Sequence, residues 1–134
     1  MEQLNKIVPA FLVLLAVIVG SLSKDSNGTQ SGTDDSWFQS AVLNNSHPVV
    51  VKFGAEWCGP CRSMDQALLT LEGRYSARAR FLKINIDEKP ELFQQYGEGT
   101  GIPQIMVFRG GKVVAFDSGF GGTETLNTWL SENL

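Results

Sequence analysis

The hydrophobic residues of this chain follow three patterns. One is an uninterrupted apolar run from Ile7 to Leu22. A second is the short apolar run, which predicts β-strands at 49–54, 81–86, 105–108 and 113–116. A third has apolar residues at helical spacing, which predicts helices at 37–43, 60–75, 91–96 and 123–130. The run 49–54 is apolar almost throughout, which indicates a central strand buried on both faces.

Signals at the ends of these segments support the predicted boundaries. Asp34 or Asp35 can cap the first helix, and Thr123 can cap the last. Pro60 falls in the first turn of its helix, where proline is tolerated, and the Gly-Gly pair 110–111 suits a tight hairpin turn. Strands that alternate with helices imply a parallel sheet, and the late hairpin adds an antiparallel pair. We therefore predict an α/β fold, with a mixed central sheet of about four strands flanked by helices.

The apolar run Ile7–Leu22 precedes this predicted domain. Its length lies between that of a signal-peptide core, about 7–15 residues, and that of a membrane-spanning helix, about 17–25. We expect residues 1–22 to be a signal peptide or a signal anchor, and favour the anchor because residues 19–23 offer a mediocre cleavage site. The polar stretch 23–33 is typical of a flexible linker, which leaves 34–134 as the domain. Either outcome predicts an extracytoplasmic domain, anchored to the membrane or secreted.

Charge and cysteine content narrow the function further. The net charge is −3, and no basic patch with interleaved aromatic residues is present, so a nucleic-acid partner is not expected. Cys58 and Cys61 are the two cysteines of the chain. A domain of about 100 residues can bury a sufficient core without disulfide bonds. The two cysteines are therefore available for chemistry.

Both cysteines belong to the segment Trp57-Cys58-Gly59-Pro60-Cys61, at the predicted junction between a strand and a helix. A helix N-terminus carries partial positive charge and unpaired N–H groups, and both stabilise a thiolate. The thiolate is the nucleophile of disulfide exchange. We therefore predict that Cys58 and Cys61 are catalytic and that Trp57, Gly59 and Pro60 shape the rim of the site.

Two other uses of a closely spaced cysteine pair are disfavoured. A zinc site needs three or four protein ligands, and His47 is the single histidine that could help. A purely structural disulfide would close a very small loop and so would constrain the unfolded chain little. We therefore expect redox exchange, with no metal and no organic cofactor.

With these motifs in place, the chain resembles the thioredoxin family over residues 34–134. The matching segments are 55–62 (AEWCGPCR), 83–87 (KINID), 101–103 (GIP), the Gly-Gly hairpin and Gly119. The resemblance implies a thioredoxin-like fold, a protein-disulfide oxidoreductase activity, protein substrates with cysteines or disulfides, and a redox donor protein. It also implies that Pro103 is a cis proline facing the disulfide and that Ile102 offers backbone groups to the substrate. Position alone would equally allow Pro103 to start a strand.

The chain also departs from the family pattern. The polar linker occupies the place of the family's first strand, which predicts that this strand is missing. The loop before Gly101 is about one residue longer, and Gln66 stands where the family has a proline that kinks the helix. The buried acid of the strand before the motif, which takes the proton from the second cysteine in the family, is replaced by Lys52. The aromatic residue two positions later is replaced by Gly54.

Lys52 therefore has two interpretations. Its stem is buried while its ammonium reaches water at the end of the strand, or it lies behind Cys61, near Lys83, and takes part in the thiol chemistry. In the second case a neutral Lys52 could act as a base, because burial lowers the pKa of a lysine, whereas a charged one would stabilise a thiolate. We include Lys52 and Lys83 as supporting residues of the predicted active site.

The residues leave three functions open. The first is an exported reductant of protein disulfides, as the Gly59-Pro60 dipeptide of reducing thioredoxins suggests. The second is an extracytoplasmic disulfide oxidant or isomerase, which loss of the acid and retention of Lys52 and Lys83 would favour. The third is a tethered thioredoxin-like binding module whose thiols are not essential. We favour the first.

Overall fold

A computed structural model describes residues 35–99 and 101–134. The predicted signal segment 1–22 and linker 23–33 lie outside the described residues. Within the two described ranges, no helix combines the length and the apolar character needed to cross a membrane.

The described domain is built on a four-stranded sheet with the order β2-β1-β3-β4. β1 (Val49–Gly54) pairs in parallel with β2 (Arg80–Asn85), whereas β3 (Gln104–Arg109) is antiparallel to both β1 and β4 (Lys112–Ser118). This confirms the predicted mixed sheet of about four strands. Every residue of β1 is buried, as its apolar sequence predicted.

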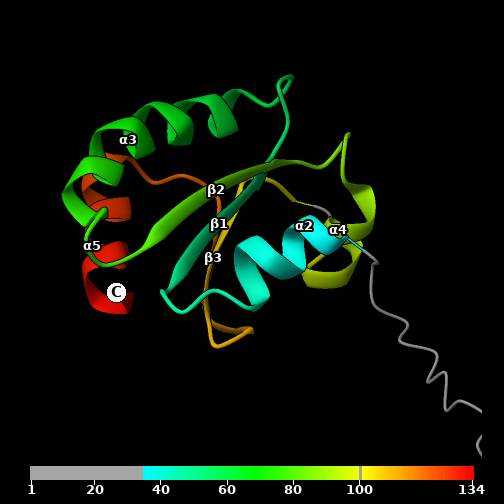
Figure 1. The fold of residues 1–134 in the computed structure, drawn as a ribbon. Coiled ribbons are helices and arrows are strands. Elements are labelled where there is room, and N and C mark those ends of the chain that lie inside the picture. The colour runs from blue at the N-terminus through cyan, green and yellow to red at the C-terminus, as the bar shows by residue number, and fades with distance from the viewer. Residues whose placement is uncertain (1–34, 100) are drawn as a thin grey trace, which may run out of the picture. The chain divides into compact units, whose positions relative to one another are not determined.

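Helices cover both faces of the sheet (Figure 1). α3 and α5 lie on one face, and α2 and α4 lie on the other. The helical segments are α2 (Ser36–Phe38), the π-helical segment η2 (Gln39–Leu43), α3 (Gly59–Tyr75), α4 (Pro90–Tyr96) and α5 (Thr123–Asn133). The predicted helices and strands are therefore all present, with boundaries shifted by a few residues at most.

Two details of the helix ends differ from the prediction. The Asp35 carboxylate accepts a hydrogen bond from Phe38 N at 3.1 Å and so caps α2, but the following turns form a π-helix instead of continuing as α-helix. Thr123 was predicted to cap the last helix. Instead it is the first residue of α5, and Gly122 occupies the cap position with a φ of 106°. Glycine adopts this left-handed backbone region readily because it has no Cβ.

The alternation of side chains along β1 divides the core into two layers. Val50 faces α3 and α5 together with Leu68 and Leu130, whereas Val51 faces α2 and α4 together with Phe38. Lys52 and Gly54 lie on the same side of the strand as Val50. The core layer between the sheet, α3 and α5 therefore contains a charged residue, Lys52.

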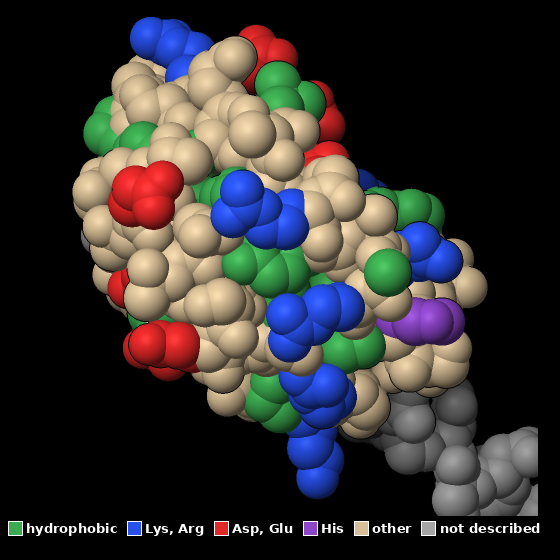
Figure 2. Space-filling view, turned by 90° about the vertical axis from the view of Figure 1, so that its left-hand side faces the viewer, with side chains coloured by type: hydrophobic (Ala, Val, Ile, Leu, Met, Phe, Trp, Pro, Cys, Tyr) green, Lys and Arg blue, Asp and Glu red, His purple; other side chains and the backbone are tan. Residues whose placement is uncertain are grey.

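The tight hairpin between β3 and β4 is confirmed. Gly110 and Gly111 have positive φ angles of 59° and 77°, as the preferred two-residue turn requires. The surface beside α5 and the C-terminal end of α3 carries both acidic and basic side chains (Figure 2), in keeping with the small net charge of −3.

Candidate active site

The cysteine pair lies where β1 passes into α3, as the sequence predicted. Cys58 and Cys61 form a disulfide with a Cα–Cα distance of 5.2 Å. Cys58 is the N-cap residue of α3, and its Sγ accepts a hydrogen bond from Cys61 N at 3.2 Å. A cap position of this kind directs backbone N–H groups and the positive end of the helix dipole at the sulfur. The site is therefore built to stabilise a Cys58 thiolate.

The two cysteine residues differ in their exposure to solvent. Cys58 has 6% of its surface exposed, whereas Cys61 has none. Trp57 beside them is 67% exposed, and its indole N–H donates to Asp87 Oδ2 at 2.9 Å. Gly59 and Pro60 are exposed in the first turn of α3. An incoming disulfide would therefore meet Cys58 first, beside an open apolar rim.

The loop before β3 forms the opposite wall of the site. The Ile102–Pro103 peptide bond is cis, as the family resemblance implied. The Ile102 carbonyl oxygen lies 3.9 Å from Cys58 Sγ. Ile102 also packs against the small cluster formed by Ala55, Cys58 and Cys61. The backbone of Ile102 is therefore placed to contact a chain bound at Cys58.

Gln104, which sequence reasoning missed, holds this loop. Gln104 is 1% exposed. Its Nε2 donates hydrogen bonds to the Glu98 carbonyl at 2.7 Å and to the Gly101 carbonyl at 2.6 Å. Its Oε1 accepts a hydrogen bond from Glu98 N at 2.9 Å. A buried amide with all its partners satisfied is a rigid support. The available signal was a single amide at the start of the otherwise apolar strand 104–108.

Lys52 is placed behind the disulfide. Its side chain is 5% exposed, and its Nζ lies 2.9 Å from Asp65 Oδ1. The interpretation in which the ammonium reaches water at the end of the strand is therefore wrong. A buried ammonium needs a partner, and Asp65 on α3 supplies it.

The Gly54 position explains how a lysine fits there. A Cβ added to Gly54 would lie 2.7 Å from Lys52 Cε and 3.2 Å from Cys61 Cβ. The end of the Lys52 side chain thus fills the space that a side chain at 54 would occupy. The two departures from the family pattern, at positions 52 and 54, are consequences of one packing arrangement.

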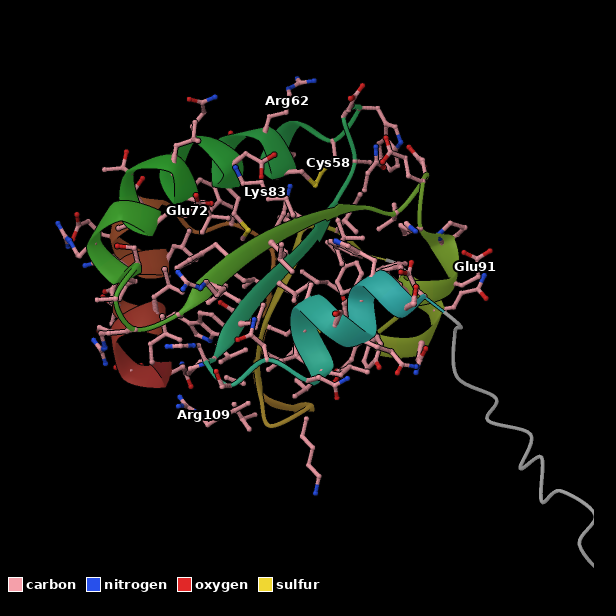
Figure 3. The ribbon with its side chains drawn as sticks, in the orientation of Figure 1. Cys58, Arg62, Glu72, Lys83, Glu91 and Arg109 are labelled. Atoms are coloured by element: carbon pink, nitrogen blue, oxygen red, sulfur yellow. A yellow bond between two sulfur atoms is a disulfide. The ribbon has the colours of Figure 1, made fainter. Side chains whose placement is uncertain are left out.

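Lys83 lies beside Lys52 in the strand register, on the neighbouring strand β2. Its Nζ is 3.9 Å from Glu72 Oε1, and Figure 3 shows Lys83 and Glu72 between β2 and α3, with Cys58 at the N-terminal end of that helix. Two neighbouring lysines repel each other. α3 offsets this repulsion with one carboxylate for each, Asp65 and Glu72.

A cavity of about 470 Å³ opens beside these residues. Its lining includes both members of the Lys52–Asp65 ion pair and Gly54, and its other charged residues are Glu56, Arg62, Lys83 and Glu88. Arg62 Nη1 donates to the Glu56 carbonyl at 2.9 Å. The Asp65 side chain is 32% exposed, whereas that of Lys52 is 5% exposed. Asp65 therefore lies between the buried ammonium and the solvent of the cavity. In the described part of the chain, no group of three or more His, Cys, Asp or Glu residues could hold a metal ion.

Comparison with known proteins agrees with this geometry. A family model described as Thioredoxin matches residues 29–132. The chain belongs to the thioredoxin family. This thioredoxin is 37% identical to Thioredoxin 1 of Nostoc sp. over 100 residues, and the aligned region covers 75% of this chain and 92% of that protein. It is 40% identical over 102 residues to the thioredoxin of Acidithiobacillus ferridurans, with 76% and 93% covered. It is 43% identical to the M-type chloroplastic thioredoxin of Chlamydomonas reinhardtii over 79 residues, which are 59% of this chain and 56% of that protein.

These relatives confirm the predicted family and fold. They also identify this thioredoxin as a thiol–disulfide oxidoreductase, acting on protein disulfides together with a reductant partner. The individual roles of the site residues remain predictions. We expect Cys58, at the accessible helix start, to attack the substrate disulfide and form a mixed disulfide. Cys61, one turn further along α3, would then attack Cys58 Sγ and release the reduced substrate.

Proposed function

We propose that this thioredoxin works outside the cytoplasm, held at the membrane or secreted by its N-terminal segment, and reduces disulfides of exported proteins. The observation that carries the proposal is the apolar run Ile7–Leu22, which precedes the segment 29–132 that matches the family. Two relatives are covered over 92% and 93% of their length, whereas only 75% and 76% of this chain is matched. The chain thus adds a long apolar run to a nearly whole thioredoxin.

The reducing direction rests on the motif and on the relatives. The dipeptide Gly59-Pro60 between the cysteines is that of reducing thioredoxins, and the relatives are named thioredoxins. Each reduced substrate leaves Cys58 and Cys61 oxidised. A redox donor protein must therefore return two electrons to the pair outside the cytoplasm, where the glutathione and thioredoxin systems of the cytosol do not keep thiols reduced.

One observation favours a second candidate, an extracytoplasmic oxidant or isomerase. The buried ammonium of Lys52 lies close to Cys61, and a cation next to a thiol stabilises the thiolate. A more stable dithiol form raises the reduction potential. The third function considered, a tethered binding module, would need no thiol at all. A Cys58→Ser variant that retained biological function would support it.

Localisation tests the export part of the proposal. The full chain carries a C-terminal reporter enzyme that becomes active only when it folds outside the cytoplasm. We expect activity from the wild-type fusion and loss of activity when Leu14→Arg and Leu15→Arg introduce two charges into the apolar run, because such charges are costly in a bilayer. Ser26→Arg in the predicted linker is the matched control and should have no effect. A wild-type fusion that stays cytosolic would refute export.

The reduction potential tests the direction of electron flow. Thioredoxin has a potential of about −270 mV, protein disulfide isomerase about −180 mV and DsbA about −120 mV. We expect equilibration of the full chain with glutathione redox buffers to give a value nearest the first of these. A value nearest either of the other two would favour the oxidant or isomerase and would leave the localisation result unaffected.

A further inference from the structure

The structure assigns a proton-handling role to the ion pair behind the disulfide. We propose that the Asp65 carboxylate accepts the proton of the Cys61 thiol during disulfide exchange, and that Lys52 positions this carboxylate. The proposal concerns the thiol chemistry alone and does not depend on where the protein is located.

Stability alone does not explain the ion pair between Lys52 and Asp65. Lys52 lies in β1 within the α3 layer of the core, with 4% of its surface exposed. Removing an ammonium from water costs several kcal/mol, and replacing a buried ion pair with apolar side chains is often neutral or stabilising. The Asp65 side chain is 32% exposed, so the ammonium is the buried member of the pair. A buried lysine that requires a glycine at position 54 to fit calls for an explanation besides stability.

The ion pair lies beside Cys61. Asp65 follows Cys61 by four residues in α3, which places the two side chains on one face of the helix with Cβ atoms about 5–6 Å apart. Lys52 Cε and Cys61 Cβ lie 2.7 and 3.2 Å from one and the same point, the ideal Cβ position of Gly54. Lys52 Nζ is 2.9 Å from Asp65 Oδ1, so the ion pair holds the carboxylate on the side of α3 that carries Cys61, which is where a general base for this thiol must lie.

A proton transfer from Cys61 to Asp65 leaves the number of charges in the site unchanged. Before the transfer, the site holds the Lys52 ammonium, the Asp65 carboxylate and a neutral Cys61 thiol. Afterwards it holds the ammonium, a neutral carboxylic acid and a Cys61 thiolate. One positive and one negative charge are present throughout, so no unpaired charge forms in the core. The ammonium exchanges a carboxylate partner for a thiolate partner.

The full reaction then balances. The Cys58 thiolate attacks a substrate disulfide, a mixed disulfide forms, and the first substrate sulfur leaves as a thiolate that takes a proton from water. The Cys61 proton passes to Asp65, and the Cys61 thiolate attacks Cys58 Sγ. The bond between Cys58 and the substrate breaks, and the second substrate sulfur leaves as a thiolate and is protonated. Asp65 returns its proton to water through the adjacent cavity. The substrate gains the two electrons that the cysteine pair loses.

Several other charged groups surround the Lys52–Asp65 pair, and a control variant must leave them in place. Lys83 on β2 is the neighbouring cation and is paired with Glu72, which lies about two turns beyond Asp65 in α3. The remaining charged groups of the cavity are Glu56, Arg62 and Glu88. Glu91→Gln removes an exposed carboxylate from α4, on the opposite face of the sheet, and leaves Lys52, Lys83 and both of their partners in place. It is therefore the control.

The test is a stopped-flow reaction of the reduced full chain with an aromatic disulfide that releases a coloured thiolate. The first release reports attack by Cys58, and the second reports resolution by Cys61. We expect Asp65→Asn to slow the second release at pH 7 by at least about 10-fold, below the typical range of general-base contributions, and to leave the first within about 2-fold. The slowing should disappear above about pH 9, where thiols ionise in water. Asp65→Glu should restore most of the rate.

A double variant keeps the test decisive if Asp65→Asn destabilises the domain. Lys52→Met with Asp65→Leu removes both charges and leaves an apolar pair, which should preserve folding. We expect this variant to show the same slow second release and the same recovery at high pH, whereas Glu91→Gln behaves as wild type. A folded double variant with an unchanged second release and pH profile would show that the pair is only structural.

Discussion

Gly54→Ala should destabilise this thioredoxin, and the loss should depend on Lys52. The added Cβ would lie 2.7 Å from Lys52 Cε, about 0.7 Å closer than the 3.4 Å at which ordinary contacts begin, and 3.2 Å from Cys61 Cβ. Overpacking of this kind costs about 1–3 kcal/mol. If the shift also separates Lys52 from Asp65, a buried ammonium loses its partner and the cost rises towards about 3–5 kcal/mol.

The same substitution should cost much less when the lysine is absent. In a Lys52→Ala background the 3.2 Å approach to Cys61 Cβ is the tight contact that remains, and the gain of about 0.4–1 kcal/mol that alanine brings through the unfolded state offsets its cost. A double-mutant cycle should therefore give a coupling free energy of at least about 1 kcal/mol between positions 52 and 54. The backbone at Gly54 does not need positive φ, so the effect is steric.

The assay is equilibrium unfolding of the oxidised full chain in urea, followed by tryptophan fluorescence. Gly73→Ala is the control, because a Cβ at this position in α3 meets nothing within 4 Å. It should stabilise the protein by about 0.5–1 kcal/mol, since alanine favours a helix over glycine. Equal costs of Gly54→Ala with and without Lys52 would refute the packing argument.

Three further predictions concern the cap of α2, the two thiols and the loop before β3. The hydrogen bond from Lys89 lowers the pKa of the Asp35 carboxyl below its ordinary value of 3.8, so Asp35 stabilises the fold above that pH and the benefit is lost as pH falls through the lowered pKa. The Tm difference between wild type and Asp35→Asn should therefore be constant from pH 5 to 8 and vanish in strong acid; a difference that persists there would contradict this. Alkylation of the reduced protein at pH 6–7 should label Cys58 first, as mass spectrometry can check, whereas earlier labelling of Cys61 would reverse the assigned roles. Gln104→Leu should cost about 1–3 kcal/mol in unfolding, because buried loop groups lose their partner, and should raise KM for a protein disulfide; an unchanged KM would exclude a role in substrate binding.

Local pattern determined most of the fold. The apolar runs and helical spacings identified every helix and strand that the structure describes, because burial of one face or both leaves a period in the sequence that needs no knowledge of the neighbours. The segment 57–61 located the cysteine pair at a strand–helix junction for the same reason. The cis bond before Pro103 was inferred through the family resemblance. The residue pattern alone also allowed an ordinary strand-start proline.

Tertiary structure decided what surrounds the disulfide. Lys52 and Asp65 are separated by 13 positions in the chain, and their pairing depends on how α3 packs on β1, which no local period encodes. The space vacated at Gly54 likewise exists only between two packed elements. Gln104 is recognisable as a support only once the loop that it holds is in place. These contacts join residues that are distant in the sequence. The sequence alone therefore identified the two reactive cysteines, whereas the packing of α3 on the sheet determined which charged and polar groups surround them.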